Sequence, residues 1–172
     1  YSRLMEIDEE GTLATLSAHR TITDDLIAGH AGRIFGTAGD SVLAEFASVV
    51  DAVDCAVKIQ DALAVANEAL PEEHRLRFRI GINVGDVMVK DGDIFGDGVN
   101  IAARLEGLAE AGGICISRGV HDHIRRKLPY GFVDLGEQSV KNIAQPIRVF
   151  RLITDATEAE SASIGRPVTA AR

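Results

Sequence analysis

Residues 93–104 read Asp-Ile-Phe-Gly-Asp-Gly-Val-Asn-Ile-Ala-Ala-Arg, a glycine-punctuated loop that runs into a helix. Asp97 is suited to cap this helix, and Gly98 lets the backbone turn. Asn100 and Arg104 are four residues apart and therefore project from one helix face. An amide and a guanidinium on the first turns of a helix are suited to bind a phosphate or a carboxylate. A solvated polar face has the same spacing, so this stretch alone leaves both interpretations open.

The chain of 172 residues is 46% hydrophobic and 26% charged, which predicts one domain with a sizeable core. No apolar run approaches the roughly 20 residues that span a bilayer, and residues 1–5 lack the apolar core of a signal peptide. We therefore expect a cytoplasmic location without direct membrane insertion. The net charge of -8 argues against binding of nucleic acid over a broad surface, but it allows a local pocket for a phosphorylated ligand. Cys55 and Cys115 are expected to be buried, reduced thiols.

The residues before this stretch predict two helices with a hairpin between them. Apolar residues recur at helical spacing from Leu13 to about Gly29, which places His19 at the surface or near the helix end. Two strand-like runs then flank residues 36–41, Gly-Thr-Ala-Gly-Asp-Ser, which predicts a hairpin with Asp40 at its turn. Glycine and aspartate favour turns for backbone reasons, so Asp40 needs no functional explanation on this ground alone. A long helix, capped by Ser48, follows.

The second half predicts mostly strands. Residues 75–85 alternate between polar and apolar side chains and are expected to form a hairpin with residues 87–90 through Gly85 and Asp86. Further on, a buried strand at 114–117, a short basic helix and two closing strands at 132–135 and 147–152 are expected. From Thr154 onward the sequence has no periodicity. These patterns predict a domain over residues 1–153 and a flexible tail or linker over residues 154–172.

Five segments, taken in order, resemble the catalytic domain of class III nucleotidyl cyclases, the adenylate and guanylate cyclase family. They are Tyr1–Met5, Gly39-Asp40 in its hairpin, Arg79–Gly85, Asp93–Gly96 and Val99–Arg104. The resemblance extends from Tyr1 to about Leu152. It implies an α/β (α+β) fold with a ferredoxin-like βαββαβ core and additional strands, which agrees with the order of elements predicted above. Fold and function are separate conclusions, so each site residue is carried over individually.

The resemblance implies two-metal catalysis by two Mg²⁺ or Mn²⁺ ions, which two carboxylates hold during an in-line attack on the α-phosphorus. Asp40 matches the second carboxylate. The first normally lies just before the segment that begins here at Tyr1, so we expect a truncation that removes the first strand and its metal ligand. Asn100 matches the residue that orients the ribose. Arg104 matches the residue that stabilises charge on the phosphoryl group.

The resemblance also implies the residues that bind the nucleotide. Asp93 matches the adenylate cyclase choice at one purine-binding position. Gly36 stands where those enzymes carry a lysine, so the expected preference for ATP over GTP is modest. Lys141 lies about where the family keeps a phosphate-binding lysine, but its sequence context differs, and a plain surface lysine is the alternative.

Taken together, the resemblance implies a signal-transduction lyase that converts ATP to 3′,5′-cyclic AMP and pyrophosphate. It implies a homodimer with shared active sites, in which one chain supplies the metal carboxylates and the other supplies the Asn-Arg pair. A guanylate cyclase or a non-selective purine cyclase is the alternative within the family. The alternative from another class is a catalytically inactive module for nucleotide binding or dimerisation, suggested by Gly36 and the missing first carboxylate.

Overall fold

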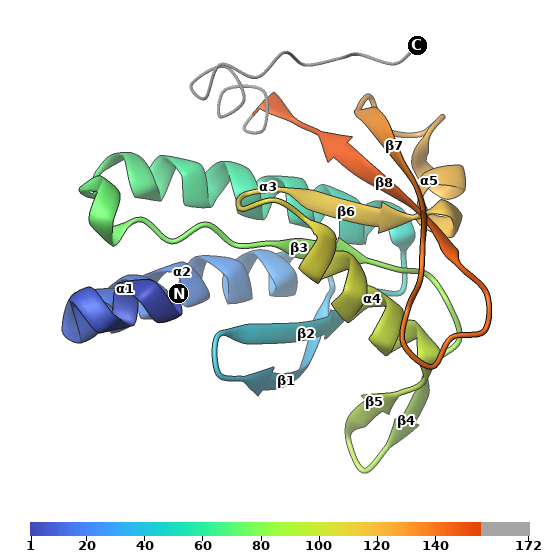
Figure 1. Ribbon diagram of the computed structural model, residues 1–172, viewed down its shortest axis with the longest axis horizontal. Helices are drawn as coiled ribbons and strands as arrows, with labels where there is room; N and C mark the ends of the chain where they lie inside the picture. The colour runs from blue at the N-terminus through green and yellow to red at the C-terminus, as the bar shows by residue number, and fades with distance from the viewer. Residues whose placement is uncertain (156–172) are drawn as a thin grey trace.

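The structure, a computed structural model, describes residues 1–155 as a mixed α+β domain (Figure 1). The helices are α1 (Ser2–Ile7), α2 (Glu9–Gly29), α3 (Val49–Glu68), α4 (Asp97–Leu108) and α5 (Arg118–Ile124), with a short 3₁₀ helix η1 (Glu72–His74). The strands are β1 (Arg33–Ala38), β2 (Ser41–Glu45), β3 (Ile80–Ile82), β4 (Met88–Lys90), β5 (Asp93–Phe95), β6 (Ile114–Ser117), β7 (Gly131–Gln138) and β8 (Ile147–Ile153). Beyond Asp155, the predicted tail lies outside the described residues.

Among the described residues the strands form three separate sheets. The central sheet has the order β3-β6-β8-β7, in which β3 and β6 are parallel and the other neighbours are antiparallel. The other two sheets are the antiparallel hairpins β1-β2 and β4-β5. The predicted β1-β2 hairpin and the predicted closing strands are therefore confirmed.

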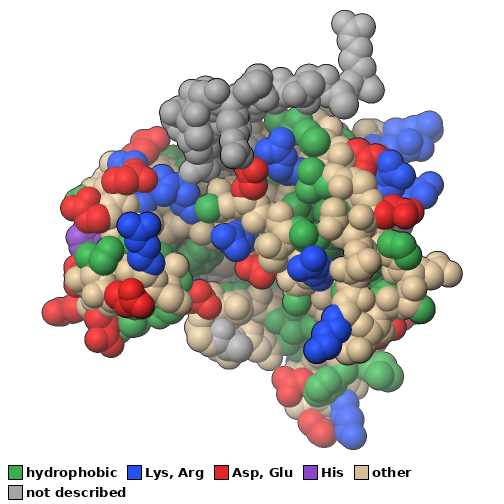
Figure 2. Space-filling view, viewed as in Figure 1, with side chains coloured by type: hydrophobic (Ala, Val, Ile, Leu, Met, Phe, Trp, Pro, Cys, Tyr) green, Lys and Arg blue, Asp and Glu red, His purple; other side chains and the backbone are tan. Residues whose placement is uncertain are grey.

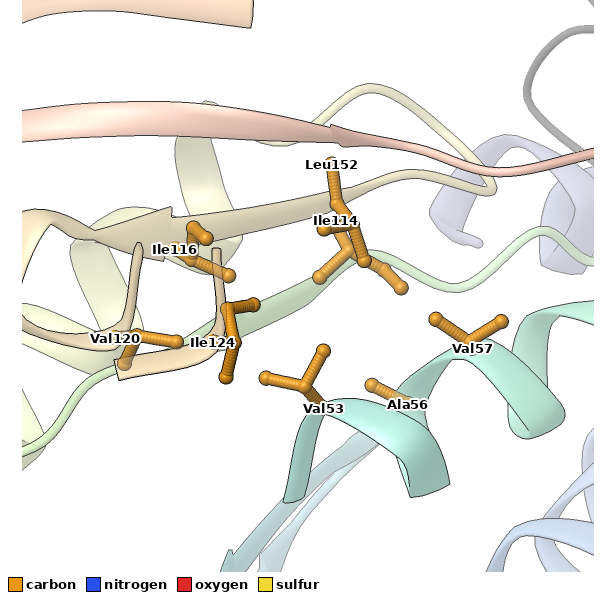
Figure 3. Close-up of a cluster of buried hydrophobic side chains, with 8 residues drawn as sticks. All are labelled: Val53, Ala56, Val57, Ile114, Ile116, Val120, Ile124 and Leu152. Carbon is orange, nitrogen blue, oxygen red and sulfur yellow. The ribbon is translucent and has the colours of Figure 1, made fainter. Parts of the chain in front are cut away.

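The main core lies between the central sheet and the helices α3 and α5 (Figure 3). Its fully buried members are aliphatic side chains that face one another from four elements, namely Val53, Ala56, Val57, Ile114, Ile116, Val120, Ile124 and Leu152. Burial of a Val, Leu or Ile side chain contributes roughly 1.5–3 kcal/mol relative to exposure, so this cluster is a main source of stability.

The helix α4 covers the opposite face of the same sheet. Because successive side chains of a strand point to opposite faces, Ile114 and Ile116 of β6 join the core with α3, while Cys115 between them packs against α4. On α4 itself, Leu105 is buried in this second cluster. The central strand β6 is thus covered on both faces.

The seam between α2 and α3 is apolar near the end of α2, where Ile27 packs with residues of α3, but polar over the earlier turns, where the sequence predicts apolar contacts. The buried residues of α2 include Thr12, Thr15, His19 and Thr23, whereas Leu13 is 44% exposed. The prediction that His19 lies at the surface is therefore wrong. Its ring is buried because the Asn67 side chain on α3 provides a hydrogen-bonding partner, with Nε2 of His19 3.0 Å from Oδ1 of Asn67.

The predicted hairpin at Gly85 and Asp86 is also wrong, because β3 pairs with β6 and β4 pairs with β5. The turn that joins β4 to β5 contains Asp91 at φ 52° and Gly92 at φ 82°. Positive φ at both central residues is the conformation that matches the twist of a two-residue hairpin, and an Asp-Gly pair adopts it readily. No helix within residues 1–155 is both long and apolar enough to cross a membrane.

Candidate functional site

The helix α4 presents Asn100 and Arg104 to solvent on one face, while Leu105 is 1% exposed on the other. Neither polar side chain has a hydrogen-bond or ion-pair partner among residues 1–155. Their amide and guanidinium donors are therefore available to a ligand. Both residues lie inside the helix Asp97–Leu108, which confirms the prediction that they project from a helix four residues apart.

The start of α4 differs from the prediction. Gly96, at φ 130°, is the N-cap, and Asp97 is the first helical residue, so the prediction that Asp97 caps the helix is wrong. Only glycine adopts this φ at low cost. The N-cap therefore lies one residue earlier than predicted. In the first turn, the Asp97 carboxylate still lies where negative charge favours a helix.

The depth of α4 against the sheet is determined by Gly81 in β3. A Cβ at this position would lie 2.3 Å from the backbone nitrogen of Glu106 and 2.4 Å from the carbonyl oxygen of Ala102. Both distances are far below van der Waals contact, so the helix backbone rests directly on the strand backbone. The position of the Asn100 and Arg104 face therefore depends on the absence of a side chain at residue 81.

Two of the predicted nucleotide-binding residues lie on strands near α4, one on a strand that contacts the helix and the other on a strand that contacts that strand. Asp93 is the exposed first residue of β5, and β5 contacts both α4 and β1. Gly36 lies in β1, and a Cβ built on it would meet no atom within 4 Å. The structure thus brings together the strands and the helix that carry Gly36, Asp93, Asn100 and Arg104.

Asp40 lies apart from this group. It is exposed at the turn between β1 and β2, beside Gly39 at φ 61°. In Figure 1 this turn is on the side of the hairpin that faces away from α4. Within residues 1–155, no three His, Cys, Asp or Glu side chains gather in a way that could hold a metal ion. One copy of the described chain therefore does not unite Asp40 with Asn100 and Arg104.

Lys141 is exposed in the connection between β7 and β8, next to Asn142 at φ 65°. The preceding residue, Val140, is buried and anchors this connection to the body of the domain. No residue among 1–155 forms an ion pair with the Lys141 ammonium.

Sequence reasoning missed Asn83, which directly follows β3. Its Nδ2 donates a hydrogen bond to the carbonyl oxygen of Gly98 in the first turn of α4, over 3.2 Å. Its place in the segment Arg79–Gly85 and its amide at the end of the alternating run are signals in the sequence, but neither predicts the contact with Gly98, which lies 15 positions away.

The β4-β5 hairpin carries a patch of exposed apolar side chains. Met88, Val89 and Phe95 are 68%, 56% and 50% exposed. Together with Lys90 they line an open hollow of about 670 Å³. Figure 2 shows this hairpin as a projection at the bottom of the view, with hydrophobic side chains on its surface. Contiguous exposed apolar groups of this kind are typical of interaction surfaces.

The fold and the comparison with known families identify the class of protein. The chain belongs to the family described as the adenylate and guanylate cyclase catalytic domain, whose model matches residues 4–154. The predicted membership of the class III nucleotidyl cyclases is thus confirmed.

Similar proteins include a Rhizobium meliloti (strain 1021) protein provisionally named adenylate cyclase 3, which is 48% identical over 151 residues. That match covers 87% of this chain and 26% of the relative. The adenylate cyclase of Streptomyces coelicolor is 32% identical over 125 residues, which cover 73% of this chain and 31% of the relative. The chain therefore spans about a quarter to a third of the length of these curated relatives.

Among solved structures, an adenylate/guanylate cyclase/hydrolase from Silicibacter pomeroyi is 46% identical, with a TM-score of 0.82 over 90% of each chain. The adenylyl cyclase CyaB from P. aeruginosa is 22% identical, with a TM-score of 0.71 over 88% of this chain and 89% of that one. An identity of 22% to CyaB shows only that the two proteins share a fold.

Proposed function

We propose that the protein is a purine nucleotide cyclase that converts ATP to 3′,5′-cyclic AMP and pyrophosphate at sites shared by two copies of the chain. The observation that carries this proposal is the pair of exposed donors, Asn100 and Arg104, on α4 beside the strand that begins with Asp93. Membership of the cyclase family supports the same chemistry.

In the proposed reaction the ribose 3′-hydroxyl attacks the α-phosphorus and pyrophosphate leaves. Asn100 holds the ribose so that its hydroxyl lies in line with the leaving group. Arg104 stabilises the negative charge that develops on the phosphoryl oxygens, a role suited to the planar, permanently charged guanidinium. Asp93 accepts a hydrogen bond from the purine, and Lys141 binds a phosphate oxygen. Solvent exposure of these side chains lets the substrate reach them without displacing a protein partner.

Asp40 is the proposed metal ligand in the described part of the chain. Its carboxylate is a hard oxygen donor of the kind that Mg²⁺ and Mn²⁺ prefer. Because residues 1–155 contain no cluster of three potential ligands, Asp40 fits this role only together with the substrate phosphates and a carboxylate from outside these residues. Two bound divalent ions supply neutralising charge at the triphosphate and acidify the attacking hydroxyl.

The separation of Asp40 from α4 supports a shared site in a homodimer. A two-fold assembly places Asp40 of one copy against the α4 face of the other and repeats the arrangement at a second, equivalent site. The exposed apolar side chains of the β4-β5 hairpin support such an assembly, because they are the kind of surface that a partner covers.

A second candidate function is a nucleotide-binding or dimerisation module without catalysis. It is favoured by Gly36, which leaves open space where adenylate cyclases of the family carry a lysine, and by the incomplete metal ligand set of residues 1–155. The same glycine favours a guanylate or non-selective purine cyclase over an ATP-specific one.

The test is production of cyclic nucleotides from ATP and from GTP, with Mn²⁺, by the full chain. Arg104→Ala should lower turnover by about 10²–10³-fold, as expected when a donor to a developing oxyanion is lost. Asn100→Ala should also lower turnover. Arg118→Ala is the matched control, since this arginine is exposed on α5 and, within residues 1–155, forms its ion pair with Asp122 one turn along the helix. Nucleotide binding without any cyclic product would favour the catalytically inactive module.

The homodimer has a separate test. Met88→Ser and Val89→Ser should shift the protein towards monomer in sedimentation at a fixed concentration. Val65→Ser is the control, because Val65 is 66% exposed on α3 and lies outside the hairpin. Equal effects of all three substitutions, or a monomeric parent protein at high concentration, would contradict the shared site.

A further inference from the structure

Asn83 connects the end of β3 to the first turn of α4. Its side chain is half-buried, and its Nδ2 donates to the carbonyl oxygen of Gly98, the second residue of α4. Asn100 lies two residues beyond Gly98 on the same turn. The hydrogen bond therefore joins the strand to the part of the helix that carries one of the proposed catalytic side chains.

The two segments on either side of this bond are closely packed. A Cβ at Gly98 would lie 3.6 Å from Nδ2 of Asn83 and 3.6 Å from the carbonyl oxygen of Asp86. A Cβ at Gly96 would lie 3.5 Å from that same oxygen. These are ordinary van der Waals distances, so the backbone at residues 96–98 follows the chain after β3 without a gap.

The first turn of α4 has no side-chain cap, since its N-cap is Gly96. The buried contacts of the helix lie further along, where Leu105 packs with Ala109, Cys115 and Val149. Among the described residues, the hydrogen bond from Asn83 is thus the side-chain hydrogen bond that attaches this first turn to the end of β3.

We propose that Asn83 is a positioning residue that holds the first turn of α4, and with it Asn100, against the end of β3. The catalytic consequence rests on the proposed cyclase function, whereas the structural role of the bond does not. A displacement of about 1 Å of a group that orients the substrate can lower a rate by as much as about 10²-fold. Loss of the bond therefore lowers kcat more than it raises KM.

Two substitutions in the full chain separate the donor from the shape of the side chain. Asn83→Asp keeps the shape but places a carboxylate, which cannot donate, against the Gly98 carbonyl. Asn83→Gln keeps the donor on a longer stem. We expect Asn83→Asp to lower kcat by roughly 10–100-fold with a much smaller change in KM, and Asn83→Gln to retain more of the parent kcat. Equal kcat values for Asn83→Asp and the parent would overturn the proposal.

A double variant tests whether Asn83 acts through Asn100. If it does, Asn83→Asp combined with Asn100→Ala should lower kcat by little more than Asn100→Ala alone. Losses that multiply would overturn the proposal. The control is Asn67→Ala, because the Asn67 amide also donates to a main-chain carbonyl, that of Leu76 at 2.8 Å, but lies between α2 and α3. Turnover per bound nucleotide should be unchanged in this control.

Hydrogen exchange provides a measurement that does not depend on activity. Asn83→Asp should speed exchange at the backbone amides of Ile101 and Ala102, whose helical acceptors lie in the first turn, and leave the amide of Leu108 unchanged. Unchanged exchange at all three amides would overturn the structural role even if the parent protein proves to be a cyclase. A parent protein that forms no cyclic nucleotide, with the expected exchange pattern, would overturn only the proposed function.

Discussion

Nε2 of His19 lies 3.0 Å from Oδ1 of Asn67 in the buried seam between α2 and α3. The orientation of the Asn67 amide follows from its other contact, because Nδ2 donates to the carbonyl oxygen of Leu76 over 2.8 Å. Oδ1 therefore faces His19 as an acceptor, which assigns the proton to Nε2 of the imidazole. One amide thus provides a partner for Nε2 of a buried ring and for a buried backbone carbonyl, while Nδ1 of His19 has no hydrogen-bond partner among residues 1–155.

Replacement of Asn67 by alanine should destabilise the protein by roughly 2–4 kcal/mol, since it leaves a buried donor on His19 and a buried acceptor on Leu76 without partners. Urea denaturation measures this as a lower midpoint at an unchanged slope. Glu68→Ala, at the exposed neighbouring position on α3, should change the midpoint little. An equal loss in both variants would contradict the role of the amide.

Replacement of Gly36 by lysine should raise the preference for ATP over GTP. The position is in open space, so the longer side chain can be accommodated without a backbone clash. A cation near the base would add a donor that distinguishes the two purines, and we expect about a tenfold change in the ratio of kcat/KM values, equivalent to about 1.4 kcal/mol. Gly36→Met controls for side-chain bulk. A similar change with methionine would rule out a charge effect.

The thiols of Cys55 and Cys115 should be unreactive in the native protein. Burial raises the pKa of each to about 11, and their exposed fractions are 1% and 0%. Because the thiolate is the reactive form, iodoacetamide at pH 8 should label neither residue in the folded chain and both in denaturant. Mass spectrometry of the labelled protein measures this. Rapid labelling of either cysteine under native conditions would contradict the described packing.

Asp54 should contribute to stability above about pH 4 and lose that contribution in acid. The hydrogen bond from Lys58 lowers the pKa of this carboxyl below its usual value, and the nearby His30 acts in the same direction. A folded-state pKa below the unfolded one means that the unfolded chain takes up the proton first as the pH falls, so stability decreases there. Asp54→Asn should therefore lose less stability than the parent between about pH 5 and pH 3.

Urea midpoints at several pH values test this, and the effect is expected to be modest because the pair is partly exposed. Lys58→Met should weaken the acid dependence in the same way, and the double variant should add nothing further. Identical pH profiles for the parent and Asp54→Asn would contradict the assignment.

The elements that sequence patterns predicted well are those with local causes. Ser48 caps α3 by accepting a hydrogen bond from the backbone of Asp51, as its position before an apolar run indicates. Likewise, strand-like runs around a Gly-Asp pair predict the β1-β2 hairpin. The wrong predictions involve competition between similar signals. Gly85-Asp86 and Asp91-Gly92 both indicate turns, and the structure forms the hairpin only at the second.

The polar seam between α2 and α3 was missed for a different reason. Hydrophobic periodicity identifies a buried face only when that face is apolar, whereas α2 buries threonines and His19. These polar groups find partners that periodicity does not indicate: the Thr23 hydroxyl donates to the carbonyl oxygen of His19 one turn earlier, and Asn67, 48 residues away, contacts Nε2 of His19. The same limit applies to the candidate site, where Asn100 and Arg104 follow from helix spacing, but Asn83 is identified only by its contact with Gly98.

The direct contact between Gly81 and the backbone of α4 also limits the movements open to this helix. A helix that rests on a strand without intervening side chains has little freedom to slide or rotate, because either movement brings backbone atoms into collision. In the proposed dimer, the gap between Arg104 of one copy and Asp40 of the other then changes chiefly when the two copies move as rigid bodies. Any change of activity in that dimer would therefore come from the angle between the subunits, with each domain internally unchanged.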